Sequence, residues 1–369
     1  EIVVQYPIVS NPRDYGAKMY ISIIGKAGSG KTTLFQALSG VTKSLNGGSR
    51  DIVAIDVPDE RLEYLSSVFS PRKTVYARID VSDTIAIDKG DLKNETLNQK
   101  SVQQLRSSDA FLLILKNFDN GEEINPVDDF LAIYNEFILA DMVQIENRIE
   151  RIERQYGKKD APPYQQERGL LEKCLDHLNN GAPLSLLALP EEEEKRIRGF
   201  QLLSRRPMMV VVNCTEQTLS SAESVAEEFR NTLPPHIPVL AVCAKLEAEL
   251  ALMSPEERTI FMSEYGIREA IRSRIIHIAL DTLGLISFLT VGDDECRAWP
   301  IKKGMNAQDA AGTIHTDLAN KFIRAEAVSY KAFVEHGGFA GCKKSGLWRL
   351  EGKTYVVQDG DILSIRAGN

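Results

Sequence analysis

The sequence predicts an α/β protein: a parallel sheet covered by helices on both faces, a helical hairpin between its third and fourth strands, and a small α+β module at the C-terminal end. Three observations support this prediction. Apolar runs rich in β-branched residues alternate with helical patterns, a long apolar seam of helical spacing interrupts that alternation, and beyond Leu283 short strand-like runs are separated by glycine-containing turns.

Composition excludes several classes of protein. The chain has 369 residues, of which 43% are hydrophobic and 26% charged, and its formal net charge is −8. This length exceeds that of one small module, and this composition is typical of folded globular proteins rather than disordered or fibrous ones. The acidic excess argues against a protein held on nucleic acid by overall charge, and we expect no sequence-specific DNA partner.

Cysteines and apolar runs indicate the compartment. The five cysteines lie far apart without a C-x-x-C pair, which favours reduced thiols over a disulfide framework or a zinc site. The longest apolar runs, 111–115 and 208–212, are far shorter than the ~20 residues of a membrane span. No charged-then-apolar signal precedes Tyr6, so we expect a cytoplasmic protein without a membrane partner.

The first expected strand and helix flank a glycine-rich turn. Residues 19–24 form an apolar run typical of a buried strand, and Thr33, Leu34, Ala37 and Leu38 after the turn have helical spacing. Because helical stretches separate several of the later apolar runs, a parallel sheet is expected. These further strands are expected at residues 75–81, 110–115, 208–212 and 239–242.

The segment between the third and fourth runs has the pattern of paired helices. From Ile138 its apolar positions step by three or four residues, and a second such pattern follows a breaker at residues 158–163. The two patterns predict an antiparallel hairpin, with a packed helix pair inside one larger domain as the alternative. The first seam consists of Met142, Ile145, Ile149, Ile152 and Tyr156, and the second of Leu171, Cys174, Leu175 and Leu178.

The region 284–369 predicts a small mixed sheet with one helix. It contains eleven Lys and Arg against ten Asp and Glu, so it is near neutral and has no simple nucleic-acid footprint. Strands are expected at residues 288–291, 322–328, 353–357 and 362–365, and a helix at 307–318.

The turn after the first strand carries specific chemistry. Residues 25–32 match G-x-x-x-x-G-K-[ST], a phosphate-binding loop, with a chance glycine-rich connection as the alternative. Glycines let backbone N–H groups point at the β-phosphate, Lys31 adds charge across the β- and γ-phosphates, and the Thr32 hydroxyl can bind Mg²⁺. The candidate nucleotide-binding residues are Gly25, Lys26, Ala27, Gly28, Ser29, Gly30, Lys31, Thr32 and Thr33.

A second Mg²⁺ ligand is expected at an acidic strand end, because a carboxylate there completes the metal site of such loops. Asp83 follows the expected strand 75–81 at a suitable distance, and Asp80 and Asp88 compete with it. A solvated loop carboxylate is the alternative role.

Two short motifs resemble the base-binding loops of GTPases. Asn213, Cys214 and Glu216 occupy the places of Asn, Lys and Asp in Asn-Lys-x-Asp, directly after the run 208–212. Cys243-Ala244-Lys245 follows the next run and resembles a Ser-Ala-Lys loop. The missing lysine at Cys214 and the longer side chain of Glu216 disturb the fit to guanine, which predicts ATP as the nucleotide and GTP as the less favoured one.

Together with these loops, several longer motifs make the chain resemble the YchF, or Obg-like ATPase, family from about Met19 onward. They are densest after Leu283. The motifs are Val57-Pro58-Asp59-Glu60-Arg61-Leu62, Leu283-Gly284-Leu285, Arg297-Ala298-Trp299, Ala310-Ala311-Gly312-Thr313-Ile314-His315-Thr316-Asp317, Phe322-Ile323-Arg324-Ala325-Glu326 and Val357-Gln358-Asp359-Gly360-Asp361.

This resemblance implies three parts: a Ras-like nucleotide-binding domain at residues 1–127 and 207–282, an inserted coiled-coil hairpin at 128–206, and a TGS-type domain, ubiquitin-like in fold, at 283–369. It also implies ATP as the preferred nucleotide and slow hydrolysis. The implied partners are ribosomes or translation-related proteins or RNA, bound through the hairpin and the C-terminal domain.

The chain departs from the family pattern at three places. Ala27-Gly28-Ser29 stands where the family has Pro-Asn-Val, Ala86 replaces the glycine of Asp-x-Ala-Gly, and residues 41–51 hold no clear counterpart of the switch threonine. Ile87 cannot orient a water molecule as Gln does in Ras-like sites. Beyond the charge of Lys31 no catalytic residue is therefore assigned, and any hydrolysis depends on positioning, electrostatics or a group from a partner.

The leading interpretation is a Mg²⁺-dependent, ATP-binding NTPase that hydrolyses slowly and acts as a conformational switch. The alternatives are a nucleotide-sensing adaptor that binds ATP without turning it over, a GTP-binding protein, and a small-molecule kinase. The phosphate loop suggests the kinase, but no arginine-rich lid stands out in the sequence.

Overall fold

The structure is a computed structural model that describes residues 19–40, 52–92, 94, 96–121, 123–156, 162–265, 267 and 269–368. By compactness the chain divides into two units. The first contains Tyr20–Val53 and Asp80–Thr282, and the second contains Ala54–Ile79 and Leu283–Asn369. The three-part division at residues 128, 207 and 283 stays a prediction, because a division by compactness does not test it.

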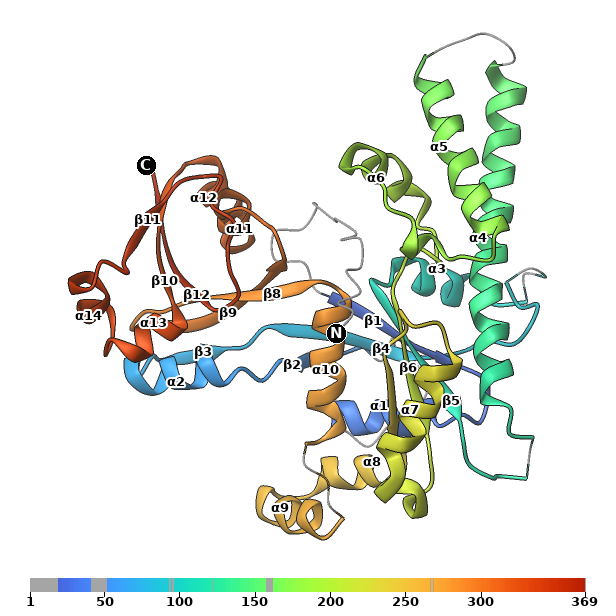
Figure 1. Ribbon diagram of the computed structural model, residues 1–369, viewed down its shortest axis with the longest axis horizontal. Helices are drawn as coiled ribbons and strands as arrows, with labels where there is room; N and C mark the ends of the chain where they lie inside the picture. Colours follow the sequence, from blue (N-terminus) through green and yellow to red (C-terminus); the bar gives the residue numbers. More distant parts are fainter. Residues whose placement is uncertain are drawn as a thin grey trace. The chain divides into compact units, whose positions relative to one another are not determined.

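A six-stranded sheet with the order β2-β4-β1-β5-β6-β7 organises the first unit (Figure 1). Its members β1, β5, β6 and β7 are parallel neighbours, and nearly all of their side chains are buried, as continuous apolar runs predict. The strands are β1 (Met19–Gly25), β2 (Ile52–Asp56), β4 (Arg78–Ala86), β5 (Ala110–Lys116), β6 (Met208–Asn213) and β7 (Val239–Val242).

Helices connect these strands. Several begin at residues suited to a helix N-terminus: α4 and α5 begin at prolines, and α9 follows Ser254, whose side chain forms a capping box with Glu257. The helices of the first unit are α1 (Lys31–Ser39), α3 (Gln99–Ser107), α4 (Pro126–Tyr156), α5 (Pro162–Asn179), α6 (Glu191–Ile197), α7 (Ala222–Thr232), α8 (Ala244–Leu252), α9 (Pro255–Glu264) and α10 (Ile271–Thr282), with short 3₁₀ turns η1 (Leu184–Leu186), η2 (Arg198–Phe200) and η3 (Glu216–Ser221).

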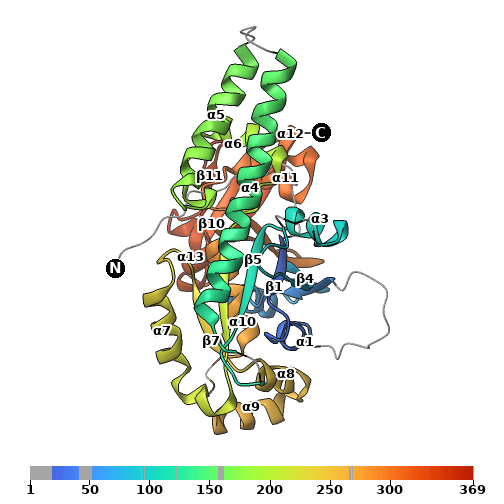
Figure 2. The same ribbon diagram turned by 90° about the vertical axis from the view of Figure 1, so that its right-hand side faces the viewer.

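The long helix α4 serves two cores in turn. Its first half packs on the central sheet through Phe130, Ile133 and Phe137, and its second half packs against α5 (Figures 1 and 2). Residues of the two predicted seams share one buried cluster: Ile145 and Ile152 lie in it together with Leu171, Cys174 and Leu178 of α5. The helix begins at Pro126, twelve residues before the predicted seam, because its first turns bury apolar residues against a sheet rather than against another helix.

The second unit is built on another six-stranded sheet, with the order β11-β10-β12-β8-β9-β3. The short β3 pairs in parallel with β9, so a segment from early in the chain completes this sheet. Its elements are α2 (Glu60–Phe69), β3 (Lys73–Val75), β8 (Leu285–Thr290), β9 (Glu295–Lys302), α11 (Ala307–Ile314), α12 (Thr316–Asn320), β10 (Phe322–Ser329), α13 (Tyr330–Glu335), α14 (Phe339–Lys344), β11 (Arg349–Glu351) and β12 (Asp361–Ala367).

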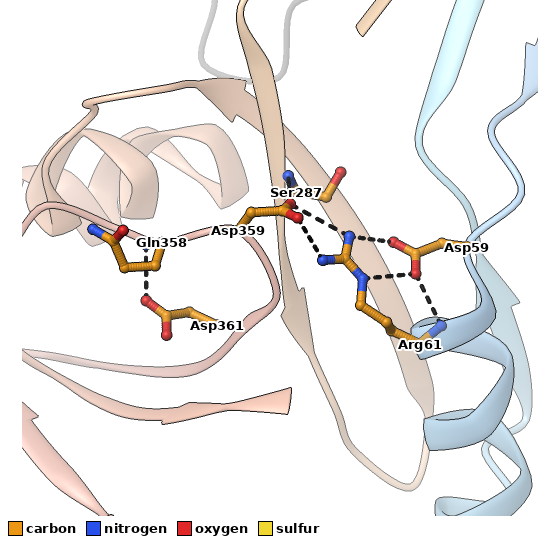
Figure 3. A network of polar contacts seen from close by, with 6 residues as sticks. All are labelled: Asp59, Arg61, Ser287, Gln358, Asp359 and Asp361. Carbon is orange, nitrogen blue, oxygen red and sulfur yellow. Dashed lines mark hydrogen bonds and ion pairs between the residues drawn. The ribbon is translucent and has the colours of Figure 1, made fainter. Parts of the chain in front are cut away.

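Within this unit, Arg61 joins α2 to the C-terminal segment (Figure 3). The carboxylate of Asp59 accepts hydrogen bonds from the backbone N–H and the guanidinium of Arg61, which caps α2. On its other side the guanidinium donates to Asp359, which also accepts the N–H of Ser287 at 2.9 Å. A Cβ at Gly360, whose φ is 78°, would lie 2.8 Å from Nη1 of Arg61, so a larger residue there would displace the guanidinium.

The predicted strand 75–81 is wrong, because this run contains parts of two strands. β3 ends at Val75 in the sheet of the second unit, whereas β4 begins at Arg78 and continues to Ala86 in the other sheet. Apolar residues alternate through both strands, so the sequence pattern does not mark the break. Asp83 consequently lies inside β4 instead of following a strand, and its side chain is outside the described part of the structure.

Two predictions for the C-terminal region are also wrong. The predicted helix 307–318 is split into α11 and α12 at His315, whose backbone is extended and whose side chain accepts the N–H of Asp317 to cap α12. The predicted strand 353–357 is a loop that contributes one isolated bridge, between Asn306 and Val356. Within the described residues no helix combines the length and apolar composition of a membrane span.

Candidate functional site

The phosphate loop lies between β1 and α1, as the motif requires. Gly25, Gly28 and Gly30 have φ of 150°, 74° and 93°, a region that favours glycine. A Cβ at Gly25 would lie 2.6 Å from the carbonyl oxygen of Ile114, and one at Gly30 would collide with the side chain of Asn213. Both glycines are therefore required by their surroundings as well as by their backbone conformation.

The N-terminus of α1 faces the loop without a side-chain cap. Gly30 occupies the N-cap position, and the first helical hydrogen bond runs from the N–H of Leu34 to the carbonyl of Gly30. The N–H groups at the start of this helix thus lack helical partners, the arrangement that binds phosphate in many proteins. The side chain of Thr32, one residue into this helix, is exposed.

Two lysines of the loop are held by neighbours. Lys31 is buried and donates a hydrogen bond to the carbonyl of Lys26, and burial lowers the pKa of Lys31 to about 8. Nζ of Lys26 lies 2.5 Å from Oδ1 of Asp129, and this hydrogen bond raises the pKa of Lys26. The carboxylate of Asp129 therefore competes with a polyphosphate for Lys26, whereas the ammonium of Lys31 has three donors and uses one of them on this carbonyl.

Asn213 ties three loops together at the carboxyl ends of the parallel strands. Its side-chain amide donates to the carbonyl of Ser29 and accepts the N–H of Ala244, each at 3.0 Å, and its carbonyl accepts the N–H of Asn117 at 2.9 Å. The residue is buried. Both ends of the amide contact backbone groups of neighbouring loops, so Asn213 organises the site.

The other expected base-binding residues lie at the same edge of the sheet. Cys214 is buried, with its thiol against the side chain of Asn117, and burial raises the pKa of that thiol. Glu216 is in η3 and its carboxylate forms an ion pair of 2.9 Å with Lys245, whose side chain is 71% exposed. A carboxylate and an ammonium therefore stand together where GTPases carry the aspartate that binds guanine.

Comparison with known proteins shows which family this chain resembles over most of its length. Residues 285–368 match the family model YchF-GTPase_C, described as a protein of unknown function (DUF933). Over 358 residues the chain is 35% identical to the Bacillus subtilis protein named ribosome-binding ATPase YchF, with 93% of this chain and 98% of that protein covered. The chain belongs to the YchF family. An Escherichia coli O157:H7 protein of the same name is 33% identical over 357 residues, with 93% and 97% covered.

A solved structure shares the fold of this YchF-family chain. The Schizosaccharomyces pombe YchF GTPase aligns with a TM-score of 0.82 at 23% identity, and the alignment covers 98% of this chain and 100% of that chain. At this identity the likeness concerns the fold alone.

Among the acidic candidates of this YchF-family site, Asp88 is the one whose charge acts on both lysines of the phosphate loop. It follows the end of β4, and its charge opposes the lowering of the Lys31 pKa by burial and adds to the raised pKa of Lys26. Asp80 is buried within β4. The position of Asp83 within β4 leaves its role as a metal ligand a prediction.

Sequence reasoning missed three residues that the structure brings to the YchF-family site. Asn117 follows the strand 110–116 at the edge that also carries Asn213, so the alignment of strand ends could have revealed it. Asp129 and Glu136 of α4 contact the phosphate loop and the loop after β4. The predicted seam begins at Ile138, although the spacing of Phe130, Ile133 and Phe137 and the proline at residue 126 could have revealed the earlier turns of this helix.

Proposed function

We propose that this chain is a Mg²⁺-dependent, ATP-binding NTPase that hydrolyses its nucleotide slowly and works as a nucleotide-dependent switch at the ribosome. The observation that carries the proposal is the phosphate loop, which has three glycines at positive φ and is braced by the hydrogen bond from Asn213 to the carbonyl of Ser29. The names of the relatives, ribosome-binding ATPases, support the choice of nucleotide and partner.

Triphosphate binding uses both the backbone and the lysine of the loop. Backbone N–H groups at the start of α1 can surround the β-phosphate without moving, because they lack helical partners. The ammonium of Lys31 donates to the carbonyl of Lys26 and has two further donors for the β- and γ-phosphates. Ala27, Gly28 and Thr33 complete the set of residues proposed to line the polyphosphate.

The residues present fit a magnesium ion. Mg²⁺ is usually bound by one or two protein oxygens together with substrate phosphates and water, so a cage of three acidic residues is not needed. The described residues contain no such cage. The hydroxyl of Thr32 and one carboxylate, either Asp83 within β4 or Asp88 after it, are the hard oxygen donors that would hold the ion, which supplies charge neutralisation at the phosphates.

Adenine is favoured over guanine by what surrounds the base. Guanine presents two adjacent donors, N1–H and N2–H, that need one free carboxylate. The carboxylate of Glu216 is paired with Lys245 and carries one more methylene than aspartate, and buried Cys214 cannot lie along the ring as a lysine stem does. Adenine lacks N1–H and loses nothing at such a site.

Slow turnover follows from the residues after β4. Ile87 is fully buried, and its N–H donates to the carbonyl of Gly25 at 3.2 Å, so neither its side chain nor its N–H can orient water. Ala86 stands where the family carries a glycine. These observations also favour the second candidate, an adaptor that binds ATP and signals its presence without hydrolysis.

The finer architecture belongs to the same proposal. We assign the first unit to a Ras-like domain with an inserted coiled-coil hairpin, α4 and α5, and the C-terminal region to a TGS-like domain. The hairpin and the C-terminal domain offer the largest surfaces outside the nucleotide site and are the proposed contacts to the ribosome.

Purified protein should release phosphate from ATP slowly, and ribosomes should change that rate. Binding without any phosphate release, alone or with ribosomes, would leave the adaptor as the function. Transfer of phosphate to a small acceptor in place of water would favour the kinase.

A further inference from the structure

The first turn of α4 holds the phosphate loop by a charge pair. Asp129 is 9% exposed, and its Oδ1 lies 2.5 Å from Nζ of Lys26. The charges of Asp88 and Asp128 add smaller contributions to the raised pKa of this ammonium. The side chain of Lys26 is thus held by a carboxylate, although its backbone belongs to the phosphate loop.

Seven residues further along α4, a second buried carboxylate holds the loop that follows β4. Glu136 is 4% exposed and accepts the N–H of Gly90 at 2.6 Å and the N–H of Leu92 at 3.3 Å. Residues seven apart lie on the same face of a helix. Asp129 and Glu136 therefore present one acidic face to two loops of the nucleotide site.

The loop after β4 links these two contacts. The N–H of Ile87 donates to the carbonyl of Gly25, which joins the end of β4 to the phosphate loop. Asp88 follows at once and acts electrostatically on both Lys26 and Lys31. Asp88 thus interacts electrostatically with the two lysines, and two residues later the N–H of Gly90 donates to Glu136 on α4.

The same helix continues into the hairpin. Asp141, fully buried, accepts the N–H groups of Leu203 and Ser204 where the chain returns from the hairpin. Further along, Arg148 donates to Glu167 of α5 at 2.7 Å. The 31 residues of α4 span roughly 45 Å and connect the phosphate loop with the hairpin without a described interruption (Figure 2).

We propose that α4 is a transmission element that couples the γ-phosphate to the hairpin, with Lys26 as its moving contact. This proposal rests on the proposed function and deepens it. Without a triphosphate, Asp129 holds Lys26. When the γ-phosphate is present, Lys26 turns to it, Asp129 is released, and the first turns of α4 and the loop that Glu136 holds become less protected. A diphosphate leaves Lys26 on Asp129.

Affinity measurements with a matched control test the first half of this proposal. Asp129→Asn frees Lys26 and should strengthen binding of a non-hydrolysable ATP analogue by roughly three- to ten-fold. Asp128→Asn removes an equal charge from the same helix turn at an exposed residue and should change affinity less than about two-fold. The difference between the two variants should vanish when each is combined with Lys26→Met.

Hydrogen exchange of the unaltered chain tests the second half. The ATP analogue should speed exchange at Gly90, Leu92 and the first turns of α4, whereas ADP should not. At saturating analogue, Lys26→Met should lose this response. Equal exchange with both nucleotides, or a response that survives Lys26→Met, overturns the coupling.

The two proposals fail in different ways. An unaltered chain that binds no triphosphate overturns both the proposed function and the coupling. A chain that binds the analogue, but in which Asp129→Asn and Asp128→Asn have equal affinity, overturns the coupling alone.

Discussion

Arg61 and Asp359 lie 298 residues apart in the chain and form a two-point ion pair in the second unit, with Nη1 to Oδ2 at 2.7 Å and Nη2 to Oδ1 at 3.4 Å (Figure 3). The pair joins two of the motifs that carry the family resemblance, at residues 57–62 and 357–361. The second unit is thus not made of residues 283–368 alone. Its strand β3 and its helix α2 come from the segment before β4.

Replacing Arg61 should destabilise the second unit. Arg61→Ala leaves the carboxylate of Asp59, mostly buried, without its guanidinium and should cost about 1.5 to 3 kcal/mol of the free energy of unfolding. Arg72→Ala is the control, because Arg72 and its partner Asp294 are 86% and 82% exposed, and it should cost under about 0.5 kcal/mol.

Tryptophan fluorescence during urea unfolding isolates this effect. The chain has two tryptophans, Trp299 and Trp348, and both belong to the second unit. The midpoint for Arg61→Ala should fall while that for Arg72→Ala stays near the unaltered value. Equal midpoints for the two variants would mean that the ion pairs of Arg61 with Asp59 and Asp359 do not stabilise this unit.

The buried parallel strands could be predicted from sequence because their apolar runs are continuous. Such runs are typical of strands that are covered on both faces. The break between β3 and β4 could not be predicted, since alternation continues from Val75 to Val81 while the chain changes sheets. The phosphate loop could be predicted because all of its residues lie within one short segment, 25–32. Asp129 and Glu136 could not, because their roles depend on which loops α4 passes, and no local pattern encodes that.

Asn213 should contribute to stability through both ends of its amide. Asn213→Ala removes the donor to the carbonyl of Ser29 and the acceptor for the N–H of Ala244, whereas Asn213→Asp keeps the acceptor but places a buried carboxylate against the carbonyl oxygen of Ser29. We expect a loss of about 2 to 3 kcal/mol for the alanine, and a loss at least as large for the aspartate, in unfolding followed by circular dichroism. Both should weaken ATP binding, and an alanine variant of unaltered stability would contradict the bracing role.

Nucleotide affinity should fall as pH rises through about 8. Burial lowers the pKa of Lys31 to about 8, so above this pH the group is neutral and must take up a proton to pair with phosphate. The affinity for ATP should decrease up to about ten-fold per pH unit between pH 8 and 10, measured by titration calorimetry. Lys31→Arg stays charged and should be flat over this range; an unaltered chain with a flat profile would refute the assignment.

Stability should depend on pH through Asp141. Burial raises the folded-state pKa of this carboxyl from 3.8 to about 6, so between these values the folded state binds the extra proton. The contribution of Asp141 to stability is therefore largest below about pH 4 and is lost as pH rises through 6, a change of up to about 3 kcal/mol.

Asp141→Asn removes this titration and serves as the comparison. The difference in unfolding free energy between the unaltered chain and Asp141→Asn, followed by circular dichroism, should shift in favour of the unaltered chain as pH falls from 7 to 4. A difference that stays constant over this range would show that Asp141 remains ionised when folded.

Base choice should respond to the residues at the ends of β6 and β7. Cys214→Lys combined with Glu216→Asp restores the stem and carboxylate that bind guanine, and should move preference toward GTP without changing the affinity for inorganic triphosphate. A double variant that gains no affinity for GTP would mean that the base lies elsewhere.

Calorimetric titration of the unaltered chain and Lys31→Ala with ATP and GTP in the presence of Mg²⁺ tests the central claim most directly. We expect ATP to bind at least several-fold more tightly than GTP, and Lys31→Ala to weaken ATP binding by at least about ten-fold, the effect of one charge-assisted hydrogen bond. Preference for GTP, or an affinity for ATP that does not depend on Lys31, would contradict an ATP site in this phosphate loop.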